Sequence, residues 1–75
     1  MKEIAPRIAV DPDIRHGKPV IKGTRVPVAT VVAHLAQDWD IARVCAEFAI
    51  EREDVLAALR YAAQTLEEEE TQAVR

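Results

Sequence analysis

The chain has 75 residues and a formal net charge of −3, and 49% of its residues are hydrophobic although it contains only one Trp, one Tyr and one Phe. This length holds one domain, near the lower limit for a self-sufficient hydrophobic core, which must be built from Ala, Val, Leu and Ile. The single cysteine excludes an intrachain disulfide and a cysteine-based zinc site, and no apolar run reaches the ~20 residues of a membrane-spanning helix, so we expect a cytoplasmic protein.

The charge is distributed unevenly along the chain. Residues 1–25 carry six basic and three acidic side chains, a net charge of +3. Residues 26–75 carry four basic and ten acidic side chains, a net charge of −6. A basic N-terminal face suits phosphate or an acidic partner, whereas an acidic C-terminal part avoids nucleic acid.

In the first third of the chain, local glycine, proline and turn residues determine the backbone conformation. Residues 1–6 show no pattern and are expected to be frayed. Two short apolar runs at residues 8–10 and 20–21, joined by turn residues, predict a two-stranded β-ribbon within residues 8–25. Glycine accepts backbone conformations that other residues resist, and proline fixes φ. The structural motif of this segment is therefore Gly17, Pro19, Gly23, Thr24 and Pro27.

Three helices are predicted over residues 27–66, so the fold class is mostly α behind a short ribbon. The first helix runs from near Pro27 to about Gln37, the second starts at the N-cap Asp40, and the third runs from Glu51 or Arg52 to about Leu66. Apolar residues recur at helical spacing in each. The three faces are Val28, Val31, Val32 and Leu35; Ile41, Val44, Cys45 and Phe48; and Val55, Leu56, Leu59, Ala62 and Leu66.

These faces predict a common core. We expect six side chains to be buried together, and truncating Leu59 to alanine to cost about 2–5 kcal/mol. The six are Val31, Leu35, Val44, Phe48, Val55 and Leu59. Cys45 lies in the same pattern and is predicted to be a buried, inert thiol.

The end of the chain is acidic. Residues 67–75 begin with four adjacent carboxylates, and we interpret them as a solvated tail that follows the third helix. The four are Glu67, Glu68, Glu69 and Glu70.

Short turns between the helices match a helix-turn-helix arrangement, in which the third helix reads a DNA major groove. The exposed start of this third helix, residues 51–54, contains three acids and one base, and acids at a reading edge repel phosphate. A three-helix core used only for packing is the alternative. If the chain binds DNA alone, we expect the binding to be weak.

Two stretches resemble a known family. The first is I-x-V-D-P-D-I-x-x-G-K-P-V-I-K-G-T-R-V-P-V at residues 8–28, and the second is E-D-V-L-A-A-L-R-Y-A at residues 53–62. They are similar to a family of small prokaryotic proteins known as domain of unknown function 433. The resemblance spans residues 8–63, and G-K-P-x-I-x-G-T-R is its specific part. It implies a homeodomain-like helix-turn-helix fold and an antitoxin-like role beside a PIN-like nuclease toxin.

The chain departs from that family at both turns between helices. The family usually has a glycine before the second helix, where this chain has Asp38 and Trp39. It usually has proline and leucine-threonine around the second turn, where this chain has Phe-Ala-Ile-Glu at residues 48–51. Both departures affect turn geometry, and through it the angle between the last two helices.

The chain contains two glycine-containing triplets that could be mistaken for a phosphate loop. They are residues 17–19 and 23–25. A Walker loop requires G-x-x-x-x-G-K-[ST], with the lysine directly after the second glycine. Here Thr24 and Arg25 follow Gly23, and apolar residues lie between the two glycines. A turn that leads into a helix explains the pattern better.

Arg25 is the residue most readily assigned a function, because it lies at a helix start among other bases and a guanidinium pairs bidentately with carboxylate or phosphate. The alternative is an internal ion pair with Asp11, Asp13 or a helix-terminal acid. Lys18 and Lys22 are better explained as solvated ribbon side chains than as specific contacts. Nucleic-acid or partner contacts are assigned to Arg15, Lys18, Lys22, Arg25, Arg52 and Arg60.

The remaining polar and aromatic residues give no catalytic pattern. His16 is predicted to be exposed in its turn and His34 to lie on the polar flank of the first helix, and neither has ligand neighbours at metal-binding spacing, so no metal or cofactor is predicted. No nucleophile–base pair is present, which indicates that the protein is not an enzyme. Trp39 either fills the gap between helices or anchors an interface.

Three functions fit these observations. The first is an antitoxin-like module that blocks a PIN-like nuclease, with its acidic C-terminal segment mimicking the phosphates of RNA in a basic cleft. The second is a dimeric helix-turn-helix regulator of transcription, and antitoxins commonly combine both roles. The third is a structural subunit. In each case we expect a homodimer formed through a ribbon edge or the apolar side of the third helix.

Overall fold

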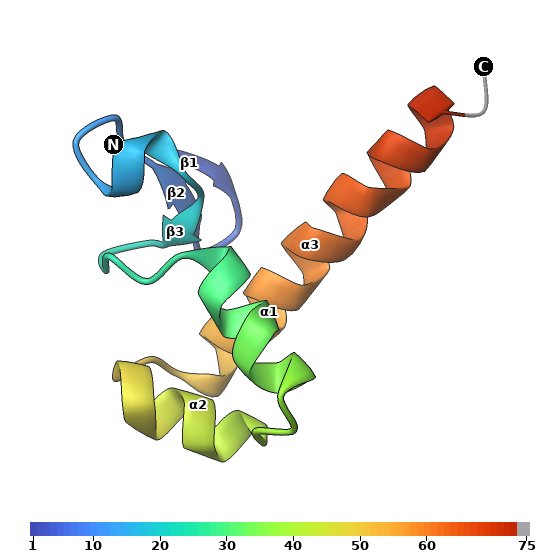
Figure 1. Ribbon diagram of the computed structural model, residues 1–75. Coiled ribbons are helices and arrows are strands. Elements are labelled where there is room, and N and C mark those ends of the chain that lie inside the picture. The colour runs from blue at the N-terminus through green and yellow to red at the C-terminus, as the bar shows by residue number, and fades with distance from the viewer. Residues whose placement is uncertain (74–75) are drawn as a thin grey trace.

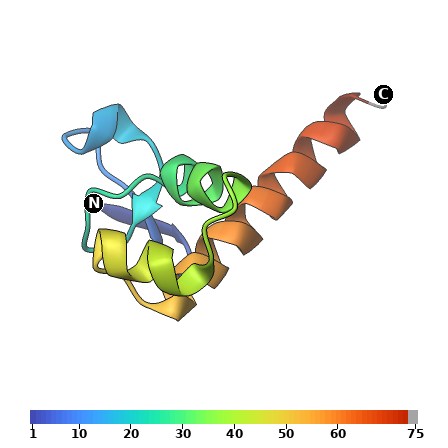
Figure 2. The ribbon, with the colours of Figure 1, turned by 60° about the horizontal axis from the view of Figure 1, so that its bottom comes forward.

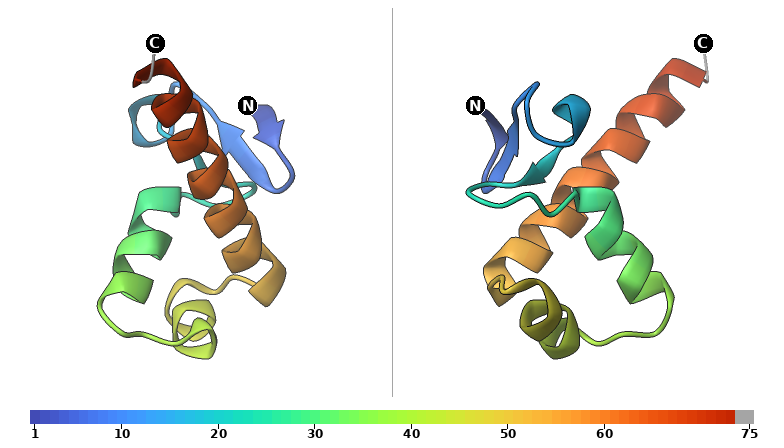
Figure 3. Two further views of the ribbon diagram at one scale, coloured as in Figure 1. Left: turned by 90° about the vertical axis from the view of Figure 1, so that its right-hand side faces the viewer. Right: turned by 60° about the vertical axis from the view of Figure 1, so that its left-hand side comes forward.

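A computed structural model describes the backbone of residues 1–73 and the side chains of residues 1–70. A three-stranded sheet comes first, with strands β1 (Lys2–Ala5), β2 (Ile8–Val10) and β3 (Val20–Ile21). Three helices follow: α1 (Val28–Ala36), α2 (Ile41–Phe48) and α3 (Arg52–Ala73). α1, α2 and the first half of α3 form the sides of a triangle, and the sheet packs where α1 begins (Figure 1 and Figure 3). This arrangement confirms the mostly helical layout behind a short β segment.

The sheet is larger than the predicted ribbon. β2 and β3 are the two predicted strands, paired antiparallel with Ile8 opposite Ile21. The prediction that residues 1–6 are frayed is wrong, because β1 pairs antiparallel with the other edge of β2. A two-residue turn at residues 6–7 joins β1 to β2, and Arg7 takes a positive φ of 66° there. β1 lacks an alternating apolar pattern because most of it is exposed, so its sequence gave no strand signal.

The start of α1 is coupled to the sheet. Pro27 is the N-cap residue, and the Val28 N–H donates to the Pro19 carbonyl at 3.0 Å. The predicted second N-cap is also confirmed, because an Asp40 carboxylate oxygen accepts from the Arg43 N–H at 2.7 Å. The start of α2 therefore follows the capping chemistry of the sequence, whereas α1 begins after a proline that forms no side-chain cap.

Both departures from the family pattern fall on left-handed backbone. Asp38, after α1, has a φ of 71°, and Ala49, after α2, has φ 55° and ψ 45°. Aspartate tolerates this region better than most residues, whereas alanine pays a steric cost that glycine avoids. Both turns therefore adopt the left-handed conformation despite its steric cost.

The core joins all the main elements. Ile8 and Ile21 from the sheet meet residues of every helix and of the turn before α3. The buried cluster is Ile8, Ile21, Val28, Val31, Val44, Ile50, Val55, Ala57 and Ala58. Leu35, Cys45 and Phe48 are only partly buried against it.

The prediction that Leu59 is a core residue is wrong. Leu59 is 36% exposed, whereas the neighbouring Ala58 is completely buried. α1 packs against α3, and the buried alanines of α3 allow a close approach of the two helices. The larger leucine, one residue further along, points away from this contact.

α3 is also longer than predicted. It continues past Leu66 through the acidic run to Ala73, so the predicted tail is helical over its described part, and residues 74–75 lie outside the described residues. Glutamate is a good helix former, and this propensity extends the helix although carboxylates at a helix C-terminus oppose the dipole. Much of the second half of α3 projects from the body (Figure 2).

The corner between α1 and α2 is filled by aromatic residues. His34 is half-buried rather than on a polar flank, and its ring meets Trp39 and Phe48 edge-on, with ring centroids 4.6 and 5.1 Å away. The Arg43 guanidinium lies over the Trp39 ring at 3.7 Å. Trp39 packs against the core and fills the gap between the helices.

Candidate partner-binding surfaces

The glycine-threonine-arginine triplet forms a tight turn between β3 and α1. Gly23 has a φ of 81°, in the left-handed region that favours glycine. The Thr24 hydroxyl donates to the Ile21 carbonyl at 2.8 Å and accepts from the Val26 N–H at 3.0 Å. Because the hydroxyl and the glycine serve the backbone of this turn, they are engaged within the chain.

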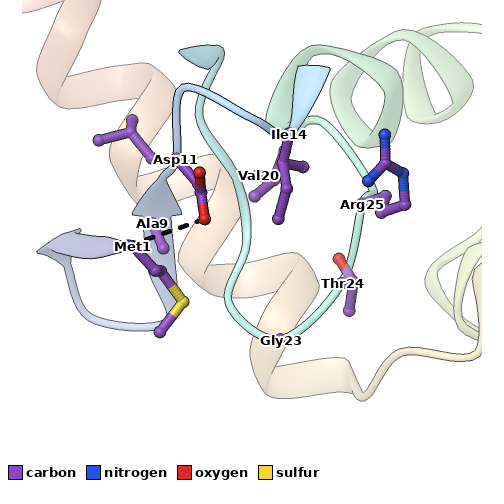
Figure 4. Close-up of a pocket in the computed structure, with 9 residues that line it drawn as sticks. Met1, Ala9, Asp11, Ile14, Val20, Gly23, Thr24 and Arg25 are labelled. Atoms are coloured by element: carbon purple, nitrogen blue, oxygen red, sulfur yellow. Dashed lines mark ion pairs between the residues drawn. The ribbon is translucent and has the colours of Figure 1, made fainter. Parts of the chain in front are cut away.

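A small pocket of about 270 Å³ lies beside this turn (Figure 4). Apolar side chains from β2, β3 and the intervening loop form much of its wall, with Arg25 at one end and Asp11 at the other (Figure 4). Asp11 pairs with the amino group of Met1 at 3.7 Å. The carboxylate and the guanidinium at opposite ends of this apolar pocket make no nucleophile–base pair.

Arg25 does not form the internal ion pair that was weighed against a functional role. Among residues 1–70, whose side chains the structure describes, its guanidinium pairs with no acid, and its backbone carbonyl accepts from Arg15 Nε at 3.2 Å. Arg15 and Arg25 are both exposed, so the turn offers two neighbouring cations to a partner.

The other predicted bases are scattered. Lys22 is engaged, with its ammonium 2.8 Å from Glu3 Oε1. This hydrogen bond and a second one from the Arg7 backbone N–H lower the pKa of Glu3 below its ordinary value of 4.5. Lys18 is exposed beside α1, and Arg52 and Arg60 are exposed on α3. The six predicted bases therefore do not form one continuous cationic site.

Arg7 is a connecting residue that the sequence did not reveal. Its Nη1 lies 2.9 Å from Asp54 Oδ1 and 3.3 Å from Glu51 Oε1. These hydrogen bonds raise the pKa of Arg7, and they tie the β1–β2 turn to the start of α3. Asp54 also caps α3, because its Oδ2 accepts from the Glu51 N–H at 2.9 Å. A separation of 47 residues between Arg7 and Asp54 left no local signal.

The second half of α3 exposes both apolar and acidic side chains. Leu66 is 59% exposed, and the four glutamates after it are all exposed. A groove of about 550 Å³ runs between α1 and this half of α3. Its lining is mainly apolar and includes Pro27, Val28, Val32, Ala62 and Leu66. The exposed leucine and the groove provide surface for another protein chain.

Among the described residues, no group of three or more His, Cys, Asp or Glu side chains is placed to hold a metal ion. Within the same part of the chain, no helix combines the length and apolar character needed to span a bilayer.

A family model for proteins of unknown function, DUF433, matches residues 8–62. The chain belongs to this family. Comparison with curated proteins and with solved structures finds no match. The DUF433 match contains β2, β3, α1, α2 and the first half of α3. Leu66 and the acidic run lie beyond the matched residues.

Proposed function

We propose that this chain is an antitoxin-like protein that binds and neutralises a PIN-like nuclease through the projecting end of α3. The observation that carries the proposal is the acidic helical arm, residues 67–70, whose four carboxylates are exposed on a helix that extends beyond the domain. Successive helical side chains point ~100° apart, so these four carboxylates surround the helix axis.

Such an arm suits a basic cleft. A nuclease that holds RNA must attract phosphate, and a rod of carboxylates presents a comparable density of negative charge. Electrostatic complementarity of this kind mainly accelerates association, so its effect weakens as the salt concentration rises. The proposal also agrees with the antitoxin-like role that the sequence resemblance implies, and the matched family itself is one of unknown function.

The experiment needs a PIN-like nuclease, which is to be sought first in the reading frame next to the gene for this chain. Glu68→Gln/Glu69→Gln removes two charges from the arm and keeps good helix formers. Asp13→Asn/Glu47→Gln removes two exposed charges elsewhere and is the matched control. We expect the arm variant alone to slow association at low salt and to match the unaltered chain at high salt. Equal association rates for all three proteins at every salt concentration would remove the proposal.

A second candidate function is DNA binding through α2 and α3. Three residues, 49–51, join these helices, as in a helix-turn-helix unit, and Arg7 offsets part of the negative charge at the start of α3. The test is the salt dependence of binding to the chain's own promoter DNA. If α3 reads the groove, Arg52→Ala and Arg60→Ala abolish sequence preference, whereas Lys22→Ala and Arg25→Ala only reduce the salt slope by about one each.

A further inference from the structure

α3 carries a second apolar stripe that does not face the core. Leu59, Ala63 and Leu66 follow one another at intervals of four and three residues, so they lie on one side of the helix. Leu59 is 36% and Leu66 is 59% exposed, and Ala63 is exposed between them. We call these three residues the outer stripe. The core contacts of α3 are made by Val55, Ala57 and Ala58, and Val55, four residues before Leu59, borders the outer stripe.

Charged residues continue the outer stripe at both ends. Arg52 is seven residues before Leu59, and Glu70 is four residues after Leu66, so both lie on the same side of α3 as the leucines. Both side chains are exposed. The stripe therefore reads base, leucine, alanine, leucine, acid along about 27 Å of helix.

This order is self-complementary in one direction only. If two copies of α3 pack antiparallel, Leu59 of each copy meets Leu66 of the other, and the small Ala63 side chains allow a close approach near the crossing. Glu70 of one copy then lies about 4.5 Å along the axis from Arg52 of the other, within reach of the long arginine side chain. Parallel packing places the two acidic runs against each other, which is repulsive.

The sheet offers a poorer interface. The outer edge of β1 is exposed, but its pairing register shifts between Glu3 and Ala5, and charged residues occupy its first half. Bulges and charges on an edge strand prevent strand-to-strand association. On β3, the opposite edge is occupied by the bridge from Val20 to Pro27. The apolar side of α3 is thus favoured over the ribbon edge.

We propose that the outer stripe of α3 binds the same stripe of a second copy of this chain, antiparallel, in a two-fold symmetric dimer. Both copies bury their exposed leucines, and the Arg52–Glu70 contact forms twice. Leu66 also lines the groove beside α1, so the second helix covers the edge of that groove. Glu68 and Glu69 point away from the Glu70 side of the helix, so each copy keeps acidic surface for another partner. The dimer does not depend on the nuclease.

The test is the dimer dissociation constant of the purified chain alone, from analytical ultracentrifugation over a concentration series. Leu66→Glu is expected to weaken the dimer about 100-fold or more, because two buried leucines are lost. Gln64→Glu adds the same charge on the opposite side of α3 and is the matched control. An unaltered chain that stays monomeric at about 100 μM, or a Leu66→Glu variant that dimerises normally, would overturn the proposal.

A charge exchange tests the direction of packing. Arg52→Glu and Glu70→Arg are each expected to weaken the dimer about two- to tenfold at low salt, and the double variant is expected to restore it. Failure of the double variant to recover affinity would overturn the antiparallel arrangement. Circular dichroism of each variant confirms that the fold is retained, since all the altered side chains are exposed.

Discussion

The two halves of α3 have opposite relations to the rest of the molecule. The first half is a structural element, with Val55 and Ala58 fully buried and Asp54 bonded to Arg7 of the sheet. The second half projects from the body (Figure 1). Leu66 and the glutamates after it are exposed there. One continuous helix therefore combines a buried anchor with a surface that we propose for interaction. Regular helical sequence does not by itself distinguish these roles.

The largest expected difference between the two halves is in packing. Val55→Ala should lower the free energy of unfolding by about 2 kcal/mol, because it deletes two fully buried methyl groups. Leu59→Ala should change it by about 0.5 kcal/mol or less at concentrations where the chain is monomeric. Urea denaturation of both variants measures this contrast. Equal losses would show that Leu59 is part of the core after all.

The attachment of α3 to the sheet should contribute less to the free energy of unfolding than the packing of Val55 does. Asp54→Asn is expected to cost about 1–2 kcal/mol, because the Glu51 N–H and the Arg7 guanidinium donate to different carboxylate oxygens and the amide keeps only one acceptor oxygen. Glu53→Gln is the control, because the side chain of the neighbouring Glu53 is exposed and forms no hydrogen bond within the described part of the chain. If the two variants have the same urea midpoint, the link between the β1–β2 turn and α3 does not stabilise the fold.

A glycine in the turn before α3 should make the protein more stable. Ala49→Gly is expected to raise stability by about 1 kcal/mol, because it removes the steric cost of the left-handed conformation. Ala46→Gly, in the exposed interior of α2, should lower stability by about the same amount through helix propensity. Thermal unfolding of the two variants gives shifts of opposite sign if Ala49 is strained.

The smallest expected effect concerns the exposed Glu3–Lys22 pair. Because the folded-state pKa of Glu3 is lowered, its contribution to stability is present above the ordinary value of 4.5 and is lost as the pH falls through the folded-state pKa. Glu3→Gln should therefore reduce the melting temperature slightly at pH 7, and the difference should vanish below the folded-state pKa. A difference that stays constant with pH would exclude the ion pair as its cause.

The sequence predicted the elements whose residues carry local signals. The ribbon strands β2 and β3, the start of α1 after Pro27 and the Asp40 cap all follow from turn and capping chemistry. β1 was missed because it forms by pairing with one edge of β2, whose other edge pairs with β3. β1 also has no alternating apolar residues that would mark it as a strand. The end of α3 was placed too early because a run of acids indicates solvation without distinguishing a helix from a coil.

The candidate surfaces were predicted only in part. The exposure of the acidic run followed from charge. The role of Arg25 stayed open between a partner contact and an internal ion pair, and the Arg7–Asp54 contact depends on tertiary structure. Leu59 was assigned to the core because the apolar residues of α3 form a broad face, and hydrophobicity does not tell a packing side from an open one. The spacing of Leu59, Ala63 and Leu66 was the available signal for a second stripe.

Hydrogen exchange along α3 tests most directly whether its second half is an interaction surface rather than part of the folded body. In the Leu66→Glu variant, we expect amides of residues 55–58 to exchange only on global unfolding and amides of residues 63–70 to exchange much faster. In the unaltered chain, protection of residues 63–70 should increase with protein concentration. Equally slow exchange in both halves of the variant, independent of concentration, would contradict the division of α3 into an anchor and an interaction surface.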